Sequence, residues 1–356
     1  MGIRVAIAGV GNCASALIQG VEYYKDAKRD EKVPGVMHVF FGDYHISDIE
    51  FVAAFEVNKE KIGKDLSEAI WAAPNSCAKF SDVPETGVIV QAAPIMDGVA
   101  PHMYESFRAD KSIETVDVAQ VLKETKADML INYLPVGSND ASKMYAQACL
   151  DAGCAFLNCI PAFIASNPEW AQKFVEAGLP VAGDDIKSQV GATILHRVVA
   201  RLFYDRGVLL DSTYQLNIGG NTDFENMTVE NRLHTKRVSK TEAVQSLIPY
   251  DLPTRIGPSD YVPFLEDHKI CYIRINSHSF GNLPITFDAK LVVNDSPNSA
   301  GVVIDALRAV KIALDRGISG PLLGISSYSF KHPPKQVTDD KAHQWVEDYI
   351  EGKVER

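Results

Sequence analysis

Short apolar runs alternate with amphipathic stretches through the first half of the chain. The apolar runs have the length and composition of buried parallel strands, and they lie at residues 3–8, 87–91, 128–134 and 155–160. Helical periodicity marks the segments between and after them, at residues 116–126, 138–152 and 168–177. Strands that alternate with helices predict an open α/β domain with a parallel sheet.

The hydrophobic pattern changes after Gly207. Three strand-like runs, 208–218, 269–280 and 284–293, alternate apolar and polar residues, as expected for an antiparallel sheet with one wetter face. A long amphipathic helix at 299–316 and one more helix then follow. We predict an α/β domain formed by residues 1–187 and 296–356, with an α+β domain on a mainly antiparallel sheet inserted at 188–295.

The first apolar run leads into the glycine-rich sequence GVGNCASAL. Gly9, Gly11 and Ala14 form a G-x-G-x-x-A pattern between a predicted strand and a predicted helix. Such glycines allow a tight turn and let the backbone approach a pyrophosphate, which then faces the helix N-terminus. This context predicts a Rossmann-type dinucleotide-binding domain, and a tight turn without a ligand is the plain alternative.

The acidic residue expected about 20 residues after the glycines is missing there. Residues 25–48 look instead like an inserted excursion, and the second strand begins near Ile49 and ends at Glu56. A carboxylate at that strand end would hold a ribose hydroxyl and repel a 2′-phosphate, so Glu56 favours NAD over NADP.

The stretch LPVAGDDIKSQVGAT, residues 179–193, combines a short apolar strand with a charged loop. Asp184, Asp185, Lys187 and Ser188 crowd into this loop, which a solvated acidic turn would also explain. Ser188 is a candidate N-cap for the helix that follows. Helical spacing predicts one apolar stripe on that helix, made of Val190, Ile194, Leu195, Val198, Val199, Leu202 and Phe203.

A lysine pair, Lys236 and Lys240, lies in HTKRVSKTEAV. Ser239 and Glu242 have the spacing of a capping box, which would place Lys240 in the first helical turn. The helix dipole and the neighbouring ammonium group would both oppose a positive charge there. One of the two lysines could therefore have a depressed pKa and act as a base. An ordinary pair of surface lysines is the alternative.

Further candidates lie later in the chain, and sequence alone does not bring them together. Lys269 opens a strand, Lys331 precedes two prolines in a Ser/Tyr-rich loop, and Asp295 precedes the long helix as a cap or a functional carboxylate. The histidines show no paired ligand spacing, so we predict no metal site, although a Mg²⁺ site at Asp184 or Asp185 remains open.

Composition limits the class of protein. The 356 residues carry a formal net charge of −11 and are 46% hydrophobic, which suits two domains and disfavours a general nucleic-acid or anionic-membrane surface. An anionic small molecule would need a local basic cluster. The six cysteines include no CxxC pair, no apolar run reaches membrane-spanning length, and the first strand begins without a signal peptide. We therefore expect a cytoplasmic protein.

Taken in order, six motifs resemble those of the myo-inositol-1-phosphate synthase family, in its shorter bacterial and archaeal form. They are GVGNCASAL, NYLPVGSNDAS, GDDIKSQVGAT, GGNTDFENM, the K-x-x-x-K of HTKRVSK, and DSPNSAG. The resemblance covers nearly the whole chain, and GDDIKSQVGAT together with GGNTDF and HTKRVSK is highly specific to that family.

This resemblance implies conversion of D-glucose 6-phosphate to 1D-myo-inositol 3-phosphate, with NAD as a recycled cofactor. C5 is oxidised to a ketone, C6 loses a proton, the enolate closes onto the C1 aldehyde, and the ketone is reduced again. The family also implies a homotetramer built through the β-rich domain, and a place in inositol and phospholipid biosynthesis.

The resemblance also implies roles for individual residues. Lys269 would take part in proton transfer at the carbonyl, supported by Asp295. Lys236, Lys240 and Lys331 would hold the phosphate or stabilise oxyanions, with Asp185 and Asp223 orienting them. The residues implied for NAD binding are Gly9, Gly11, Asn12, Cys13, Glu56, Asp65, Thr125, Tyr145, Asp185, Ser188, Asp223 and Lys236.

Two alternatives use the same N-terminal half of the chain. A simple NAD-dependent dehydrogenase of another small polar substrate would release NADH and would not need four lysines in the second half. A non-catalytic NAD sensor would keep the glycine loop and Glu56 and tolerate loss of the lysines.

Overall fold

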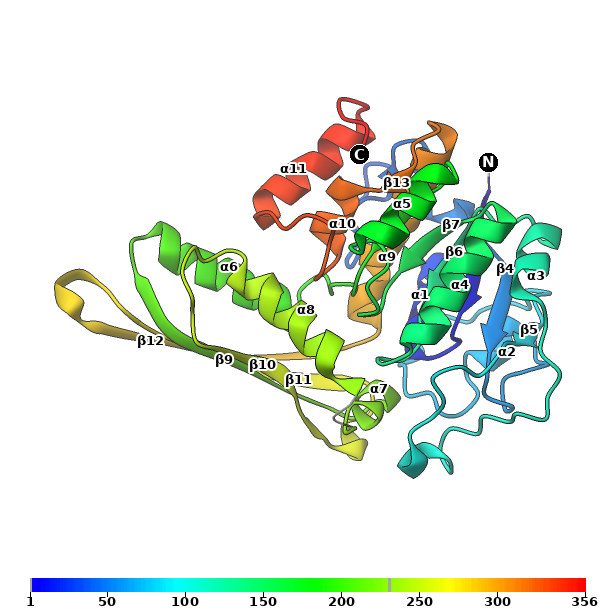
Figure 1. The fold of residues 1–356 in the computed structure, drawn as a ribbon, viewed down its shortest axis with the longest axis horizontal. Coiled ribbons are helices and arrows are strands. Elements are labelled where there is room, and N and C mark those ends of the chain that lie inside the picture. Colours follow the sequence, from blue (N-terminus) through cyan, green and yellow to red (C-terminus); the bar gives the residue numbers. More distant parts are fainter. Residues whose placement is uncertain (1, 230–231) are drawn as a thin grey trace.

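The computed structural model describes residues 2–229 and 232–356, and a seven-stranded parallel sheet forms its centre (Figure 1). The strand order across the sheet is β13-β8-β7-β6-β1-β4-β5. These strands are β1 (Ile3–Ala8), β4 (Ile49–Glu56), β5 (Val90–Ala92), β6 (Met129–Asn132), β7 (Ala155–Asn158), β8 (Pro180–Gly183) and β13 (Gly320–Pro321). The chain proceeds outward in opposite directions from β1 and β6, so a crevice opens between them at their carboxyl ends.

Helices cover both faces of this sheet, as the alternation in sequence predicts. One face packs against α1 (Asn12–Tyr23), α9 (Pro297–Asp315), α10 (Leu323–Ser329) and α11 (Asp339–Ile350). The other packs against α3 (Val118–Glu124), α4 (Asn139–Ala152) and α5 (Pro168–Glu176). Within β1, Val5 and Ile7 join the first core and Ala6 and Ala8 join the second, because side chains alternate along a strand.

The excursion at residues 25–48 packs against the long helix α9. It contains the hairpin of β2 (Phe40–Phe41) and β3 (Tyr44–His45) and a helical turn, η1 (Ile46–Asp48). The buried guanidinium of Arg308 in α9 donates to the carbonyls of Val39 and Tyr44 at 2.8 and 3.2 Å. The hairpin end of this insertion therefore packs into the core of the first domain, through Phe41, Tyr44 and Ile46, whereas its first part is exposed.

A four-stranded sheet of order β10-β9-β11-β12 extends away from the first (Figure 1). Its strands are β9 (Leu209–Gly219), β10 (Thr254–Tyr261), β11 (His268–His278) and β12 (Pro284–Asn294). β11 runs antiparallel to both β9 and β12, whereas β10 is parallel to β9. The sheet is thus mixed, with the antiparallel pairs that the alternation predicts.

Two helices, α6 (Ala192–Asp205) and α8 (His234–Gln245), cover one face of the second sheet, and the short α7 (Thr222–Asn226) follows β9. The opposite face keeps exposed apolar side chains, among them Leu216, Tyr272 and Val292. The strands of the first sheet lie within residues 1–187 and 296–356 and those of the second within 188–295. We retain this division as our proposal for the domains.

The predicted apolar stripe of α6 is wrong in part. Val190, Val198 and Leu202 are 60%, 49% and 55% exposed, whereas His196 and Arg197 are fully buried. His196 contacts the hydroxyl of Thr213 at 2.7 Å, so this buried polar group has a partner. Periodicity locates an apolar stripe, but it does not show which face of the helix other elements cover. The predicted cap at Ser188 is also wrong, since Gly191 is the N-cap and has no side chain to contribute.

Across residues 2–229 and 232–356, no helix combines the length and apolarity needed to span a bilayer.

Candidate active site

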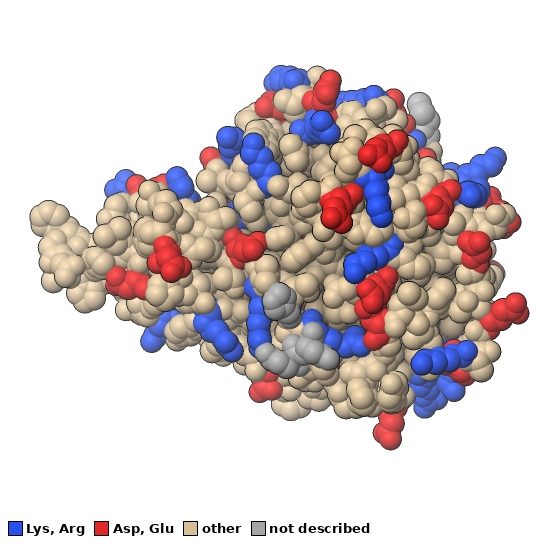
Figure 2. All heavy atoms as spheres, in the orientation of Figure 1, with Lys and Arg blue, Asp and Glu red and all other residues tan. Residues whose placement is uncertain are grey.

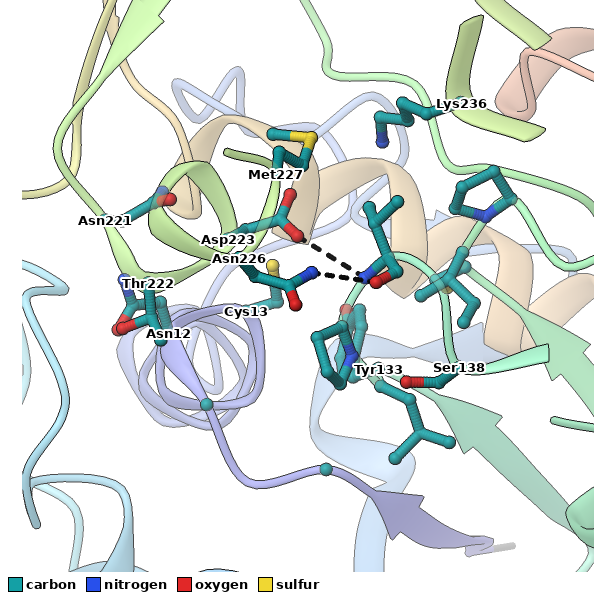
Figure 3. A pocket seen from close by; sticks show the side chains of 18 of the residues that line it. Asn12, Cys13, Tyr133, Ser138, Asn221, Thr222, Asp223, Asn226, Met227 and Lys236 are labelled. Carbon is teal, nitrogen blue, oxygen red and sulfur yellow. Dashed lines mark hydrogen bonds between the residues drawn. The ribbon is translucent and has the colours of Figure 1, made fainter. Parts of the chain in front are cut away.

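A large cavity lies at the carboxyl edge of the parallel sheet, where the second domain faces the crevice between β1 and β6 (Figure 3). In this view Asn12 and Cys13 at the start of α1 lie opposite Asp223 and Asn226 of α7 and Lys236 of α8. The loop after β6, in the first domain, contacts α7, because the carbonyl of Val136 accepts from Asn226 at 2.8 Å. Both domains therefore line one site.

The glycine-rich loop has the geometry of a phosphate cradle. Gly9 has φ +90°, and a Cβ there would lie 2.8 Å from the carbonyl oxygen of Tyr133. A Cβ on Gly11 would meet nothing within 4 Å, so the loop stays open on the cavity side. No side chain caps the start of α1. Its first N–H groups can therefore bind an anion, which fits the pyrophosphate of NAD.

Glu56 lies beside this loop, at the end of β4. Its Oε2 accepts from the N–H of Val10 at 2.9 Å, and Oε1 accepts from Val57 and Asn58. Lys61 donates to the carbonyl of Val10 at 2.5 Å, so both the N–H and the carbonyl of Val10 have side-chain partners. Burial lowers the pKa of Lys61, and the nearby Glu56 carboxylate opposes this. Sequence reasoning missed Lys61, because nothing in its local sequence distinguishes it from surface lysines.

Most residues predicted to bind NAD line this cavity. They are Gly9, Gly11, Asn12, Cys13, Glu56, Tyr145, Asp185, Ser188, Asp223 and Lys236. Burial, together with nearby Asp267, raises the pKa of Cys13 to about 12, so its side chain is a neutral thiol. Burial likewise raises the pKa of Tyr145.

Two further residues predicted to bind NAD, Asp65 and Thr125, do not line this cavity. Asp65 is the N-cap of α2 (Leu66–Ala69), where Oδ1 accepts from Ser67 and Thr86, and it does not line the cavity. Thr125 is the C-cap of α3, and its carbonyl accepts from Arg4 at 2.8 Å. A crossover helix runs opposite to the strands, so its C-terminus lies at the amino edge of the sheet, away from the nucleotide crevice.

Asp184 is a structural carboxylate. It is fully buried and accepts from the backbone N–H groups of Ile164, Ala165 and Ser166, from the Ser166 hydroxyl and from the Asn158 amide, at 2.6 to 3.1 Å. Burial raises the pKa of Asp184, and these donors oppose the rise. Asp184 holds the 164–166 turn and lies outside the cavity lining.

We expect Asp184→Ala to destabilise the fold by about 3 kcal/mol, because several buried N–H groups would lose their acceptor. Thermal denaturation would measure this as a lowered midpoint. Asp205→Ala is a matched control, since that carboxylate is half exposed and pairs with Arg201 in the same helix. Equal midpoints for both variants would contradict the assignment.

Asp185 is the acceptor at the centre of the site. It is 1% exposed, and its Oδ1 lies 3.0 Å from Nζ of Lys236 and 2.9 Å from Nζ of Lys331. Oδ2 accepts from the hydroxyl of Ser239 at 2.6 Å. Burial alone would raise the pKa of Asp185, but the two ammonium groups hold it well below its usual range. Burial also favours loss of the Lys236 proton, yet Asp185 and Asp223 raise the pKa of that lysine.

Lys240 has the opposite electrostatic surroundings. It is 4% exposed, and within the described parts of the chain no carboxylate forms an ion pair with it. Burial, reinforced by Lys269, Lys236 and Lys331, holds the pKa of Lys240 well below its ordinary value. The predicted capping box is wrong, because α8 begins at His234 and Lys240 lies in its interior. The pKa of Lys240 is therefore lowered by burial and by neighbouring ammonium groups, and not by the helix dipole that the predicted capping box implied.

Lys269 and Asp295 form the remaining ion pair of the site, with 2.9 Å between Nζ and Oδ1. Asp295 follows β12, and the N-cap of α9 is Ser296, so Asp295 is not the cap. Burial opposes ionisation of Asp295, but Lys269 keeps its pKa below the usual value. Asp223 lines the same cavity, where Oδ1 accepts from the N–H of Val136 at 3.5 Å.

Asp267 is a second residue that sequence reasoning missed. Its buried carboxylate accepts from Asn221 at 3.0 Å, from the Ser296 hydroxyl at 2.8 Å and, at 3.4 Å, from Asn12. It thus joins the start of α1 to the two segments that carry Asp223 and Asp295. Burial and the Asp295 carboxylate raise its pKa.

A Mg²⁺ site at Asp184 or Asp185 does not fit these contacts. The oxygens of Asp184 are occupied by hydrogen-bond donors, and those of Asp185 by two ammonium groups and a hydroxyl. Among residues 2–229 and 232–356, no group of three His, Cys, Asp or Glu side chains could hold a metal ion.

Comparison with known proteins gives consistent matches. The family model for myo-inositol-1-phosphate synthase matches residues 191–296. The chain is 57% identical to an inositol-3-phosphate synthase of Corynebacterium glutamicum and 56% identical to one of Mycolicibacterium smegmatis, over 98% of each chain. It shares its fold with a myo-inositol-1-phosphate synthase-related protein of Thermotoga maritima, at a TM-score of 0.81, 24% identity and 99% coverage of both chains.

Proposed function

The chain belongs to the myo-inositol-1-phosphate synthase family, and we infer from this membership that it converts D-glucose 6-phosphate to 1D-myo-inositol 3-phosphate with NAD as cofactor. When bound, NAD accepts a hydride from C5 of the sugar and later returns it. The remaining steps are loss of a proton from C6, closure onto the C1 aldehyde and protonation of the oxyanions. These steps require acid–base groups and positive charge from the protein.

One observation carries the assignment of residues to these steps. Lys236 and Lys240 from α8, Lys269 from β11 and Lys331 from the loop after α10 all line the cavity that the glycine-rich loop enters. Four amino groups at one point of a chain with net charge −11 suit a phosphorylated substrate whose transition states carry negative charge on oxygen.

We propose that the Lys269–Asp295 pair handles the proton of the C5 oxygen. The pair can accept the hydroxyl proton as C5 is oxidised, and its ammonium form can donate that proton to the oxygen when C5 is reduced again. Lys269 stands at the start of β11, where its backbone pairs with Gly219 of β9, so a rigid sheet positions the side chain.

We propose Lys240 as the base that removes the C6 proton. A lysine must be a neutral amine before it can accept a proton, and burial among three other lysines favours this form of Lys240. Lys236 and Lys331 share Asp185 and keep positive charge for the phosphate and the developing oxyanions. Asp223 would orient Lys236 and sugar hydroxyls.

Incubation with glucose 6-phosphate and a catalytic amount of NAD, followed by phosphorus NMR, tests the function. We expect inositol phosphate with no net formation of NADH. Net NADH would instead indicate a simple dehydrogenase. Binding of NAD without any product would indicate a sensor.

The pH dependence of kcat should be bell-shaped. Burial together with Lys236 and Lys269 lowers the pKa of Lys331 to about 8, against the opposing effect of Asp185. Its ammonium form is therefore lost, and kcat falls, as pH rises above about 8. Lys240 acts as the neutral amine, so kcat also falls when pH drops below the depressed pKa of Lys240.

Replacing Lys240 with methionine should remove the acid limb of this profile and lower kcat about 10²- to 10⁴-fold. Rates measured from pH 5 to 10 would check this, with binding of NAD as evidence of an intact site. Lys143→Met on the exposed surface of α4 is the control. An unchanged acid limb in Lys240→Met would assign that limb to another group.

We propose a homotetramer that associates through the second sheet. The uncovered face of this sheet is apolar in part, and Phe280 and Leu283 at the β11–β12 end are 97% and 66% exposed. Figure 2 shows that this end, at the far left, carries neither Lys/Arg nor Asp/Glu on the visible face. Exposed apolar surface of this kind supports association.

We also propose a cytoplasmic location, supported by six free cysteines, and a role in supplying inositol for phospholipids.

A further inference from the structure

Three charged side chains near the active site do not line the cavity and have no role in the proposed chemical steps. We call Lys187, Arg197 and Asp339 the anchor cluster. Nζ of Lys187 lies 3.3 Å from Oδ1 of Asp339, and Nε of Arg197 lies 3.1 Å from Oδ2. The two cationic side chains are 1% and 0% exposed. None of the three residues lines the cavity.

The first member, Lys187, belongs to the segment that presents Asp185. This segment pairs with the one that presents Lys331. The N–H of Lys187 donates to the carbonyl of Ser329 at 2.8 Å, and the N–H of Lys331 donates to the carbonyl of Asp185 at 2.7 Å. An antiparallel bridge between Ile186 and Phe330 lies between these bonds. The alignment of the two segments therefore sets the position of the Asp185–Lys331 ion pair.

The second member, Arg197 of α6, contacts α8 and the segment that precedes α11. From α6 its guanidinium donates to the carbonyl of Ala243 in α8, the helix that carries Lys236 and Lys240. It also donates to Oε1 of Gln336 at 3.2 Å and to the carbonyl of Val337 at 2.8 Å. Arg197 thus joins the lysine-bearing helix to the segment between Lys331 and α11.

The third member, Asp339, is the first residue of the C-terminal helix α11. Two buried cations meet at its carboxylate. Burial and nearby Arg197 lower the pKa of Lys187 to about 7, and Asp339 opposes this. Without the carboxylate, the Arg197 charge would lose its buried ion-pair partner, Lys187 would lose its proton, and the group that holds the two side chains together would be gone.

We propose that Asp339 is a positioning residue for the reaction, which aligns the Asp185 and Lys331 segments and α8 by bridging Lys187 and Arg197. The C-terminal helix is thereby part of the support of the active site, although it contributes no group to the cavity. This inference rests on the proposed roles of Asp185, Lys331 and Lys240.

Asp339→Asn and Asp340→Asn in the full chain test the proposal. Both substitutions remove one negative charge from the first turn of α11, so their effects on the helix dipole are the same. Asp339 pairs with Lys187 and Arg197, whereas Asp340 is exposed and, among the described residues, forms no ion pair with either of them. We expect Asp339→Asn to lower kcat about tenfold, with Kd for NAD within about twofold of the wild type. Its alkaline limb should move by about half a pH unit to lower pH, because an uncompensated positive charge disfavours the Lys331 ammonium.

Asp340→Asn should keep the wild-type kcat and pH profile, and Asp339→Glu should recover part of the lost kcat at a near-normal thermal midpoint. If Asp339→Asn does not fold, the test uses Asp339→Glu instead. We then expect a smaller fall in kcat and a shift of the alkaline limb in the same direction. Wild-type kcat and pH profile in the folded Asp339 variants would overturn the proposal, as would an equal loss in Asp340→Asn. Failure of the proposed function can be distinguished from failure of the positioning role, because the wild-type protein itself would then form no inositol phosphate.

Discussion

Lys269→Ala should abolish formation of inositol phosphate, lowering kcat at least about 10³-fold, while NAD remains bound. The substitution removes the amino group nearest Asp295 and leaves that carboxylate without its 2.9 Å partner. The glycine-rich loop and Glu56, which we expect to hold the dinucleotide, belong to the other domain and do not contact Lys269. Binding should therefore survive the loss of chemistry.

Phosphorus NMR of the product and calorimetric titration with NAD would check both parts of this prediction. Lys123→Ala is the control, since that lysine is exposed on α3 on the far side of the sheet. Product formation by Lys269→Ala at more than a tenth of the wild-type rate would remove Lys269 from the catalytic group. Loss of NAD binding would show instead that its role is structural.

Asp185→Asn should lower both activity and stability. The carboxylate separates Lys236 from Lys331, and an amide in its place would leave two ammonium groups close together in a buried site. Removing one partner of a buried ion pair typically costs about 3 to 5 kcal/mol, so the thermal midpoint should fall by several degrees. We expect kcat to fall at least about 10²-fold, because both lysines would move or lose protons.

Thermal denaturation and product formation, measured on the same preparation, would test this expectation. Asp26→Asn on the exposed excursion provides the control for loss of one negative charge. If Asp185→Asn were as active as the wild type, Asp185 could not be the group that holds Lys236 and Lys331 in place.

Local features of the fold were predictable from the sequence. The strand at residues 3–8, the glycine turn after it and the strand ending at Glu56 depend on neighbouring residues, and all three are present. The lysine group has a different origin. Lys236 and Lys331 are 95 residues apart in the sequence, yet both contact one oxygen of Asp185. Only the resemblance to a family suggested that they act together.

The surroundings of several polar residues could not be predicted, and the cause is the same for each. Asp65 and Thr125, which we predicted to bind NAD, cap α2 and α3 at positions outside the cavity lining. Lys61 and Asp267 have no distinguishing local pattern, and their burial comes from segments distant in sequence. The role of a polar residue depends on what surrounds it, and that is a property of the packed chain.

The sequence by itself determined the strand–helix alternation, the change of pattern after Gly207 and the phosphate-binding turn, because backbone preference and side-chain periodicity act over a few residues. The tertiary structure decided which lysine lacks a carboxylate, which aspartate is structural, and which polar residues lie behind the active site. These outcomes depend on burial and on distances between charges, and both are set only when the two domains and the C-terminal helix pack together.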